Sequence, residues 1–377
     1  MNAEVITLAQ QLVQKPSITP DDAGCIPLLM NRMSGQGFQG HHHRFGEVDN
    51  VLIWHGNQPG PALLFLGHTD VVSPGNEADW TYPPFSGQLA EGLLHGRGAA
   101  DMKGAVAAMV LAMEKFVATH KNHPGKIAIM LTSDEEGEAT DGIQKFMPMM
   151  AKDHHFDYCL VGEPSSSEQV GDTVRVGRRG SLHVIITIEG KQGHVAYPEL
   201  AENPVFTAAP FLAETADYVW DQGNADFPPT SFQVSNIRAG TGAANVIPGR
   251  LHITANFRYS PESSQTSLAK QLKGLLDKHG FDYQLDWALS GEPFHCKNDT
   301  FKTALKKAIQ RFSDVEPEFN TQGGTSDGRF VAPLGIATME LGPINKTIHQ
   351  VNECVPVKQL LQLENIYLDL IKRLLLP

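Results

Sequence analysis

Two segments decide the fold, ALLFLGHTD at residues 62–70 and IAIMLTSDEE at residues 127–136. Each begins as an unbroken apolar run and ends in histidine or acidic residues. Unbroken apolar runs of this length are typical of strands that are buried on both faces of a parallel sheet. Residues 102–116 between them show helical spacing of small and apolar residues, and residues 158–161 form a further apolar run. This alternation predicts an α/β domain with a mainly parallel central sheet.

The pattern changes near residue 179. Apolar and polar residues alternate along residues 182–189 and again along residues 251–257, which indicates strands with one solvent-facing side. With the helical patterns between and after them, the order β-α-β-β-α-β is that of a ferredoxin-like α+β sandwich. A chain of 377 residues also exceeds the usual size of one hydrophobic core. We therefore predict a main domain formed by residues 1–178 and 293–377, and an inserted domain formed by residues 179–292.

Charge and composition exclude several classes of partner. The formal net charge is −12 and no long run of lysine or arginine occurs, so a nucleic-acid or membrane partner is not expected. The first twelve residues have the pattern of an amphipathic helix rather than of a signal peptide. The four cysteines are far apart and form no CxxC pair, which favours a reducing cytoplasm over a disulfide framework.

Ionisable residues directly follow the predicted buried strands. His68, Glu136 and Glu163 each come after an apolar run, and Asp101 follows a glycine turn. Open α/β sheets place their functional sites at the carboxyl ends of the strands, so these side chains are expected to converge. Imidazole and carboxylate ligands without thiolate suit zinc, cobalt or manganese. A lone histidine after a strand is more often structural, and an acidic pair is more often a solvated turn, but the whole series predicts a two-metal site.

The motifs GHTDVV, GRGAADMKG, TSDEEGEATDG, VGEP, GRRGS and IHQVNE give the chain a resemblance to the metal-dependent amidohydrolases related to aminoacylase and acetylornithine deacetylase. The resemblance covers essentially the whole chain and implies a zinc-peptidase-like catalytic domain carrying a dimerisation domain. It implies two Zn²⁺ ions per subunit, for which Co²⁺ or Mn²⁺ can substitute. By resemblance, the first ion is held by His68 and Glu163, the second by Glu136 and His349, and both by Asp101, whose peptide bond to Met102 is often cis.

The resemblance also implies how the reaction proceeds. Glu135 is expected to be the general base, which takes a proton from a water activated by the metals and passes it to the leaving amine. Asp70 is expected to orient His68 through its second ring nitrogen. The inserted domain is expected to form a homodimer in which His194 and Asn245 reach the partner subunit's site. His194 would supply the donor to the oxyanion there.

Within that family, VGEPSS, QGHVAYP, NVIPG and GGTSDGR favour the branch whose members remove succinate from N-succinyl-LL-2,6-diaminopimelate during lysine and diaminopimelate biosynthesis. Guanidinium groups bind carboxylates in a bidentate way, and backbone amides of a glycine-rich turn can cradle an anion. Without the resemblance, a surface salt bridge is an equally good interpretation of each arginine. A simple tight turn is the alternative interpretation of the glycine-rich segment. The expected substrate-binding residues are Arg178, Tyr197, Asn245, Arg258, Gly324, Thr325 and Ser326, with Arg179 as a weaker candidate.

Three other functions stay open on the sequence. An acetylornithine deacetylase or a related N-acyl amino acid deacylase would share every predicted metal ligand. A dinuclear aminopeptidase or carboxypeptidase would instead cleave unsubstituted peptides. A relative that binds without turnover would be expected to have lost the base, whereas Glu135 is present. The run His41–His43 lies outside all these motifs and is interpreted as a solvated loop or strand end without metal.

Overall fold

The computed structural model of the chain describes residues 3–376. By contacts between its residues the chain divides into two compact units. The smaller unit comprises Arg178–Phe294 together with Thr321–Thr325, and the larger unit comprises the remaining described residues. Thr321–Thr325 therefore cluster with the smaller unit, although the sequence pattern places them outside the insert.

The larger unit is built on an eight-stranded mixed sheet with the order β1-β2-β6-β3-β7-β18-β8-β17. Its central strands β6, β3, β7 and β18 run parallel, as the apolar runs predicted. The strands of this sheet are β1 Gln39–Phe45, β2 Val48–His55, β3 Ala62–His68, β6 Lys126–Thr132, β7 Tyr158–Val161, β8 Thr173–Arg175, β17 Glu318–Asn320 and β18 Ala337–Glu340. A small second sheet joins β4 Gln88–Ala90, β5 Leu93–His95 and β19 Cys354–Pro356.

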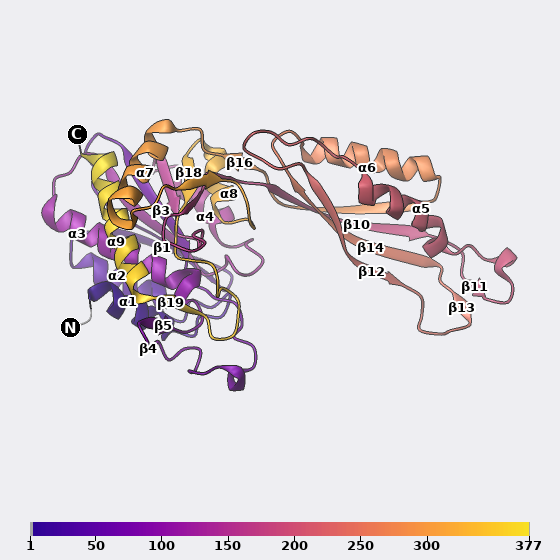
Figure 1. The fold of residues 1–377 in the computed structure, drawn as a ribbon, viewed down its shortest axis with the longest axis horizontal. Helices are drawn as coiled ribbons and strands as arrows, with labels where there is room; N and C mark the ends of the chain where they lie inside the picture. Colours follow the sequence, from indigo (N-terminus) through magenta and orange to yellow (C-terminus); the bar gives the residue numbers. More distant parts are fainter. Residues whose placement is uncertain (1–2, 377) are drawn as a thin grey trace. The chain divides into compact units, whose positions relative to one another are not determined.

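Helices cover the sheet of the larger unit on both faces (Figure 1). Strand β3 shows the consequence, because all seven of its residues are buried. Its Leu63 and Phe65 belong to the core cluster that contains α1, α2, α3, α7 and α9, while Leu64 and Leu66 belong to the cluster on the other face with α4. The helices are α1 Glu4–Val13, α2 Cys25–Ser34, α3 Gly104–Thr119, α4 Ile143–Met150, α7 Asp299–Ser313, α8 Gly328–Val331 and α9 Val357–Leu375.

The smaller unit is a four-stranded antiparallel sheet with the order β12-β14-β10-β15. The strands are β10 Gly180–Glu189, β12 Ser231–Ala239, β14 Arg250–Tyr259 and β15 Tyr283–Gly291, and the helices are α5 Pro204–Asp217 and α6 Gln265–His279. Both helices lie over the same face of this sheet (Figure 1). Leu182, Val184 and Ile186 of β10 face the helices in one core cluster, which is the ferredoxin-like arrangement that the alternation predicted.

Short elements complete the chain: η1 Glu77–Asp79, η2 Ala99–Lys103, η3 Pro198–Leu200, η4 Ala332–Leu334, β9 Gly177–Arg178, β11 Gly193–His194, β13 Val246–Ile247 and β16 Phe294–His295. His41–His43 are largely exposed, as predicted, but the predicted loop or strand end is wrong, because they lie inside the edge strand β1 with their backbones paired to β2. Among the described residues, no helix combines the length and the hydropathy that crossing a membrane requires.

Candidate metal centre

The predicted metal ligands of the larger unit sit where its strands end. His68 is the last residue of β3 and pairs in register with Thr132, the last residue of β6, so that Glu136 follows at the same edge of the sheet. Glu163 comes two residues after β7, whose Val161 pairs with Leu66 of β3. Parallel strands end at a common edge, and their following residues therefore meet there. Asp101 and His349 reach the same place from the turn before α3 and the loop before β19.

The ligand atoms form two groups that share Asp101. In the first, His68 Nε2 lies 3.3 Å from Asp101 Oδ1 and 3.6 Å from Glu163 Oε1. In the second, His349 Nε2 lies 3.0 Å from Glu136 Oε1 and 3.3 Å from Asp101 Oδ2. Each oxygen of Asp101 thus faces a different imidazole, which is the placement a bridging carboxylate needs. The peptide bond between Asp101 and Met102 is cis, as the resemblance implied.

The electrostatics of these groups match the binding of cations. Burial raises the pKa of Glu163 well above its usual value, and the charges of Asp101 and Glu135 raise it further. Burial lowers the pKa of His68, but its hydrogen bond to Asp101 and the charge of Glu163 outweigh this, so the pKa lies well above the usual value. Hydrogen bonds to Asp101 and Glu136 raise the pKa of His349 to about 10. Carboxylates crowded in a buried site repel one another, and positive charge at this place relieves the repulsion.

The donor set also fits the chemistry of the metals that the sequence suggested. Each group offers one imidazole nitrogen and carboxylate oxygens within 4.8 Å of one another. Such nitrogen and oxygen ligands suit Zn²⁺, Co²⁺ and Mn²⁺. The residues present therefore fit a two-metal centre.

Asp70 contacts the second ring nitrogen of His68 through its backbone oxygen. His68 Nδ1 lies 2.9 Å from the backbone oxygen of Asp70 and 3.6 Å from its carboxylate. The ring nitrogen therefore donates to the backbone carbonyl, which leaves Nε2 as the ligand atom. The buried Asp70 carboxylate accepts the backbone N–H groups of Glu135 at 3.3 Å and Glu136 at 3.1 Å. Its side chain thus holds the turn that carries the expected base and one expected ligand.

Glu135 is half-buried and lies among other carboxylates. Burial raises its pKa well above the usual value; the charge of His68 opposes this, and the charges of Asp327 and Glu136 add to it. Asp327 is 3% exposed, and burial raises its pKa to about 7 although the nearby Arg329 guanidinium lowers it. Sequence reasoning missed both Asp327 and Arg329, although they belong to the quoted GGTSDGR segment. The sequence spacing of these two residues gave no sign that the Asp327 carboxylate would be buried near Glu135.

The smaller unit brings three of the expected residues together. His194 of β11 and the Tyr197 ring lie with their centroids 5.7 Å apart, and Val195 donates its N–H to the backbone oxygen of Asn245 at 3.1 Å. His194 Nδ1 accepts the backbone N–H of Ala196 at 3.0 Å. An imidazole that accepts at Nδ1 carries its proton at Nε2, so His194 is set as a donor. All three side chains are exposed.

The expected substrate-binding arginines belong to the smaller unit as well. Arg178 is buried and donates from Nη1 to the backbone oxygen of Gln322 at 2.7 Å, within the glycine-rich turn. A Cβ on Gly323, whose φ is +96°, would come within 2.6 Å of that nitrogen. Arg258 is half-buried on β14, opposite Ser181 of β10.

The residues of the glycine-rich turn divide between the two units. Gly324 and Thr325 cluster with the smaller unit, whereas Ser326 clusters with the larger one. The Ser326 hydroxyl is buried and donates to Glu340 Oε1 at 2.5 Å. Its hydroxyl is therefore engaged within the chain, and an anion would meet the backbone amides of this turn.

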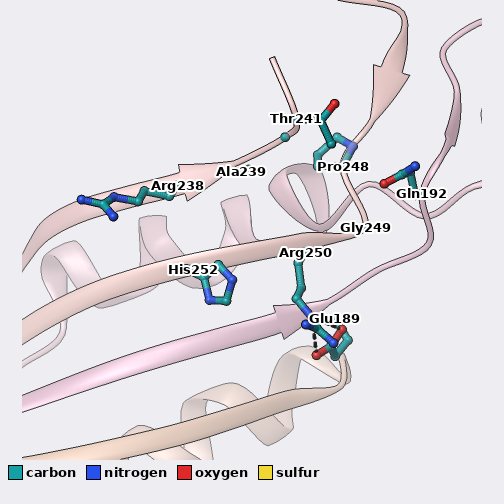
Figure 2. Close-up of a pocket in the computed structure, with 10 residues that line it drawn as sticks. Glu189, Gln192, Arg238, Ala239, Thr241, Pro248, Gly249, Arg250 and His252 are labelled. Atoms are coloured by element: carbon teal, nitrogen blue, oxygen red, sulfur yellow. Dashed lines mark hydrogen bonds and ion pairs between the residues drawn. The ribbon is translucent and has the colours of Figure 1, made fainter. Parts of the chain in front are cut away.

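A cavity of about 450 Å³ also lies on the smaller unit (Figure 2). Figure 2 shows the ion pair between Arg250 and Glu189 at its edge, with His252 and Arg238 further along the sheet. The lining residues include none of the predicted site residues. We assign this cavity no role.

Comparison with known proteins agrees with the geometry. The model of peptidase family M20/M25/M40 matches residues 64–373. A succinyl-diaminopimelate desuccinylase from Nitrosococcus oceani is 51% identical over 371 residues, which cover 98% of each chain. Among solved structures, an M20 family metallo-carboxypeptidase from Sulfolobus solfataricus has a TM-score of 0.80 at 17% identity over 99% of both chains.

Two further structures share the fold. Aminopeptidase PepT from Bacillus cereus has a TM-score of 0.79 at 21% identity over 98% of both chains. A dinuclear metal binding peptidase of the M20 family from Bacillus subtilis has a TM-score of 0.74 at 14% identity, over 97% of this chain and 96% of that one. By the family model and the 51% identical relative, the chain belongs to peptidase family M20/M25/M40, a family of metal-dependent hydrolases.

Proposed function

We propose that the chain hydrolyses N-succinyl-LL-2,6-diaminopimelate to succinate and LL-2,6-diaminopimelate, in lysine and diaminopimelate biosynthesis. The observation that carries the proposal is the 51% identity to a succinyl-diaminopimelate desuccinylase along 98% of both chains. The grouping of the expected ligands around Asp101 supports it, because a two-metal centre can activate water and polarise a carbonyl for amide hydrolysis. We further propose that the protein acts in the cytoplasm, in keeping with its four free cysteines.

The centre is proposed to hold two Zn²⁺ ions per subunit, with Co²⁺ or Mn²⁺ as substitutes. His68 and Glu163 would hold one ion, Glu136 and His349 the other, and Asp101 both. When bound, such ions supply a water of lowered pKa and polarise the amide carbonyl. His68 is fixed for this task, because its Nδ1 contacts the Asp70 carbonyl and leaves Nε2 toward Asp101 and Glu163.

Glu135 is proposed to move the proton. Its carboxylate accepts a proton from the attacking water and then donates it to the leaving amine nitrogen of diaminopimelate. Burial raises the pKa of this carboxyl, and a carboxylate with a raised pKa is a stronger base near neutral pH. Asp70 holds the backbone of Glu135 and so fixes the point from which its side chain acts.

The charged ends of the substrate call for cations and oriented amides. Arg178, Arg258 and Tyr197 are proposed to bind its carboxylates, together with the turn Gly324, Thr325 and Ser326. The Arg178 guanidinium donates from Nη1 to the backbone oxygen of Gln322 at 2.7 Å, which restricts its orientation. A guanidinium whose orientation is already restricted loses less side-chain conformational entropy when it binds a carboxylate.

The smaller unit, residues 179–292 in the sequence-based division, is proposed to form a homodimer, and the rest of the chain to be the catalytic domain. Exposed apolar side chains support an interface there, above all Phe206 of α5, which is 77% exposed, and Ile237 of the edge strand β12. His194 and Asn245 are proposed to act in the partner subunit's site. The protonated Nε2 of His194 would donate to the oxyanion of the tetrahedral intermediate.

The test is a comparison of substrates. The metal-loaded chain is assayed in parallel with N-succinyl-LL-2,6-diaminopimelate, N-acetylornithine and an unsubstituted dipeptide. The proposal expects kcat/KM to be highest for the succinyl substrate. Faster turnover of acetylornithine would keep the metal centre but replace the substrate. Turnover of the dipeptide alone would make the chain a peptidase.

A further inference from the structure

Glu353 is buried beside the metal centre without being one of its ligands. It follows His349 by four residues and has no exposed surface. Its Oε1 accepts the backbone N–H groups of Ala100 at 3.0 Å and Asp101 at 3.1 Å. Its Oε2 accepts the N–H of Gly98 at 3.0 Å and Nη1 of Arg97 at 2.7 Å. One carboxylate thus binds the whole turn that presents the bridging aspartate.

The backbone of Glu353 is fixed as well. Its carbonyl oxygen accepts the N–H of Gly96 at 2.9 Å, and the next residues, Cys354–Pro356, pair with β5. On the other side, His349 has a φ of +59°, a conformation that residues other than glycine rarely adopt. Such a conformation persists where the surrounding structure determines it. The loop is also closed by Thr347, whose hydroxyl donates to the backbone oxygen of Cys354 at 2.9 Å and accepts the Cys354 N–H at 3.2 Å.

From this geometry we infer that Glu353 is the positioning residue that couples the two metal positions. Its side chain sets the turn of Asp101, and its backbone anchors the loop of His349. The inference rests on the proposed two-metal centre, and Glu353 itself touches neither ion nor substrate in this account.

The hydrogen-bond pattern explains why a carboxylate is required. An ionised carboxylate has about four lone-pair sites and donates nothing, and here it meets four donors. A glutamine side chain has one oxygen, and its NH₂ group would face either the Ala100 and Asp101 amides or Gly98 and Arg97. Two of the four N–H donors would then face this NH₂ group instead of an oxygen in a buried place, so the turn would have to move.

Arg97 supplies the matching charge. Arg97 is 2% exposed, and its guanidinium donates to Glu353 at 2.7 Å and lies 5.2 Å from the ring centroid of Trp80. Removing one partner of such a buried ion pair destabilises the protein strongly, because the other charge stays buried without compensation. Replacing Arg97 by lysine keeps the positive charge but loses the planar guanidinium, so R97K is a second and milder way to disturb the same carboxylate.

The experiment compares E353Q with E114Q in the full-length protein. Glu114 is also buried and binds one arginine, Arg32, by two hydrogen bonds of 2.8 and 2.7 Å, but it bonds no backbone of the centre. Binding of Zn²⁺ is measured by competition with a chromophoric chelator, with circular dichroism to confirm folding. Loss of an outer partner of a metal site commonly weakens metal binding about 10- to 100-fold. We expect that loss for E353Q, partial rescue of its turnover by excess metal, and wild-type binding for E114Q.

Each outcome decides the matter. Wild-type affinity for both ions in E353Q, or equal loss in E353Q and E114Q, overturns the inference. Should E353Q fail to fold, R97K replaces it, with a smaller loss of affinity expected in support and unchanged affinity overturning the inference. Failure of the unmodified chain to bind two ions would instead refute the proposed metal centre, and the coupling with it.

Discussion

Replacing Asp70 by asparagine tests how the active turn is held. The two side chains have the same shape, but asparagine keeps one acceptor oxygen where aspartate has two. In the structure, one carboxylate oxygen takes the N–H of Glu135 at 3.3 Å and the other that of Glu136 at 3.1 Å. D70N therefore leaves one of these backbone donors opposed by an NH₂ group.

The expected decrease of kcat in D70N follows from the loss of that single hydrogen bond. An unsatisfied buried donor costs about 1–3 kcal/mol. If the cost falls on the active arrangement, kcat decreases about 5- to 150-fold, since each 1.36 kcal/mol is a factor of ten. KM should change little, because Asp70 is buried beneath the turn. The measurement is steady-state hydrolysis of the succinyl substrate at saturating metal.

The matched control is D172N. Asp172 also holds a turn, accepting the backbone N–H groups of Ser167, Glu168 and Gln169 at 2.7–2.9 Å, but outside the metal centre. It should lose stability to denaturant while keeping its kcat. A folded D70N protein whose kcat stays within twofold of the unmodified value would refute the proposed role of Asp70. Equal losses of kcat in both variants would refute it too.

Four further predictions follow from the same geometry. E135Q should lower kcat about 10²- to 10⁴-fold while both ions stay bound, as measured by kinetics and metal analysis; an active variant would exclude Glu135 as the base. Mixing H194A with E135A should restore activity through hybrid dimers with one intact site, and no recovery despite demonstrated subunit exchange would contradict the shared site. Removing the metals with a chelator should abolish turnover and lower the melting temperature, because ions that bind only the folded chain stabilise it; an unchanged melting temperature would argue against the centre. Burial raises the pKa of Asp221, but hydrogen bonds from Ser263 and Thr230 outweigh this and leave the pKa below its usual value. The stabilisation by ionised Asp221 is therefore present above about pH 4 and is lost as the pH falls through the folded pKa. D221N should be less stable than the unmodified protein at pH 7 and approach it in acid, and a difference in unfolding free energy that stays constant with pH would contradict this.

Much of the fold was predictable because its strands are buried in a regular way. The run at residues 158–161 is β7, and the helical spacing over residues 102–116 falls largely in α3. The alternation in β10 gave the antiparallel sheet of the smaller unit. Strand β1 was not predictable from hydrophobicity, because its residues are polar and mostly exposed. It exists through pairing with β2, which is a long-range backbone contact that leaves no periodic pattern.

The residues of the candidate site likewise fall into those that the sequence predicted and those that it did not. His68, Glu136 and Glu163 were visible because each follows an apolar strand, and strand ends of a parallel sheet meet at one edge. The parts that hold them were not visible. The Asp70 carboxylate and Glu353 act on backbone N–H groups distant in sequence, and any residue type supplies such a donor. Only the folded chain shows which donors a buried carboxylate meets.

The most direct test of the proposed reaction is hydrolysis of N-succinyl-LL-2,6-diaminopimelate in H₂¹⁸O by the zinc-loaded chain, with E135A in parallel. We expect rapid release of succinate that carries one ¹⁸O atom, unlabelled diaminopimelate, and turnover lowered at least about 10²-fold in E135A. No succinate release from the metal-loaded chain, or equal release by E135A, would contradict it.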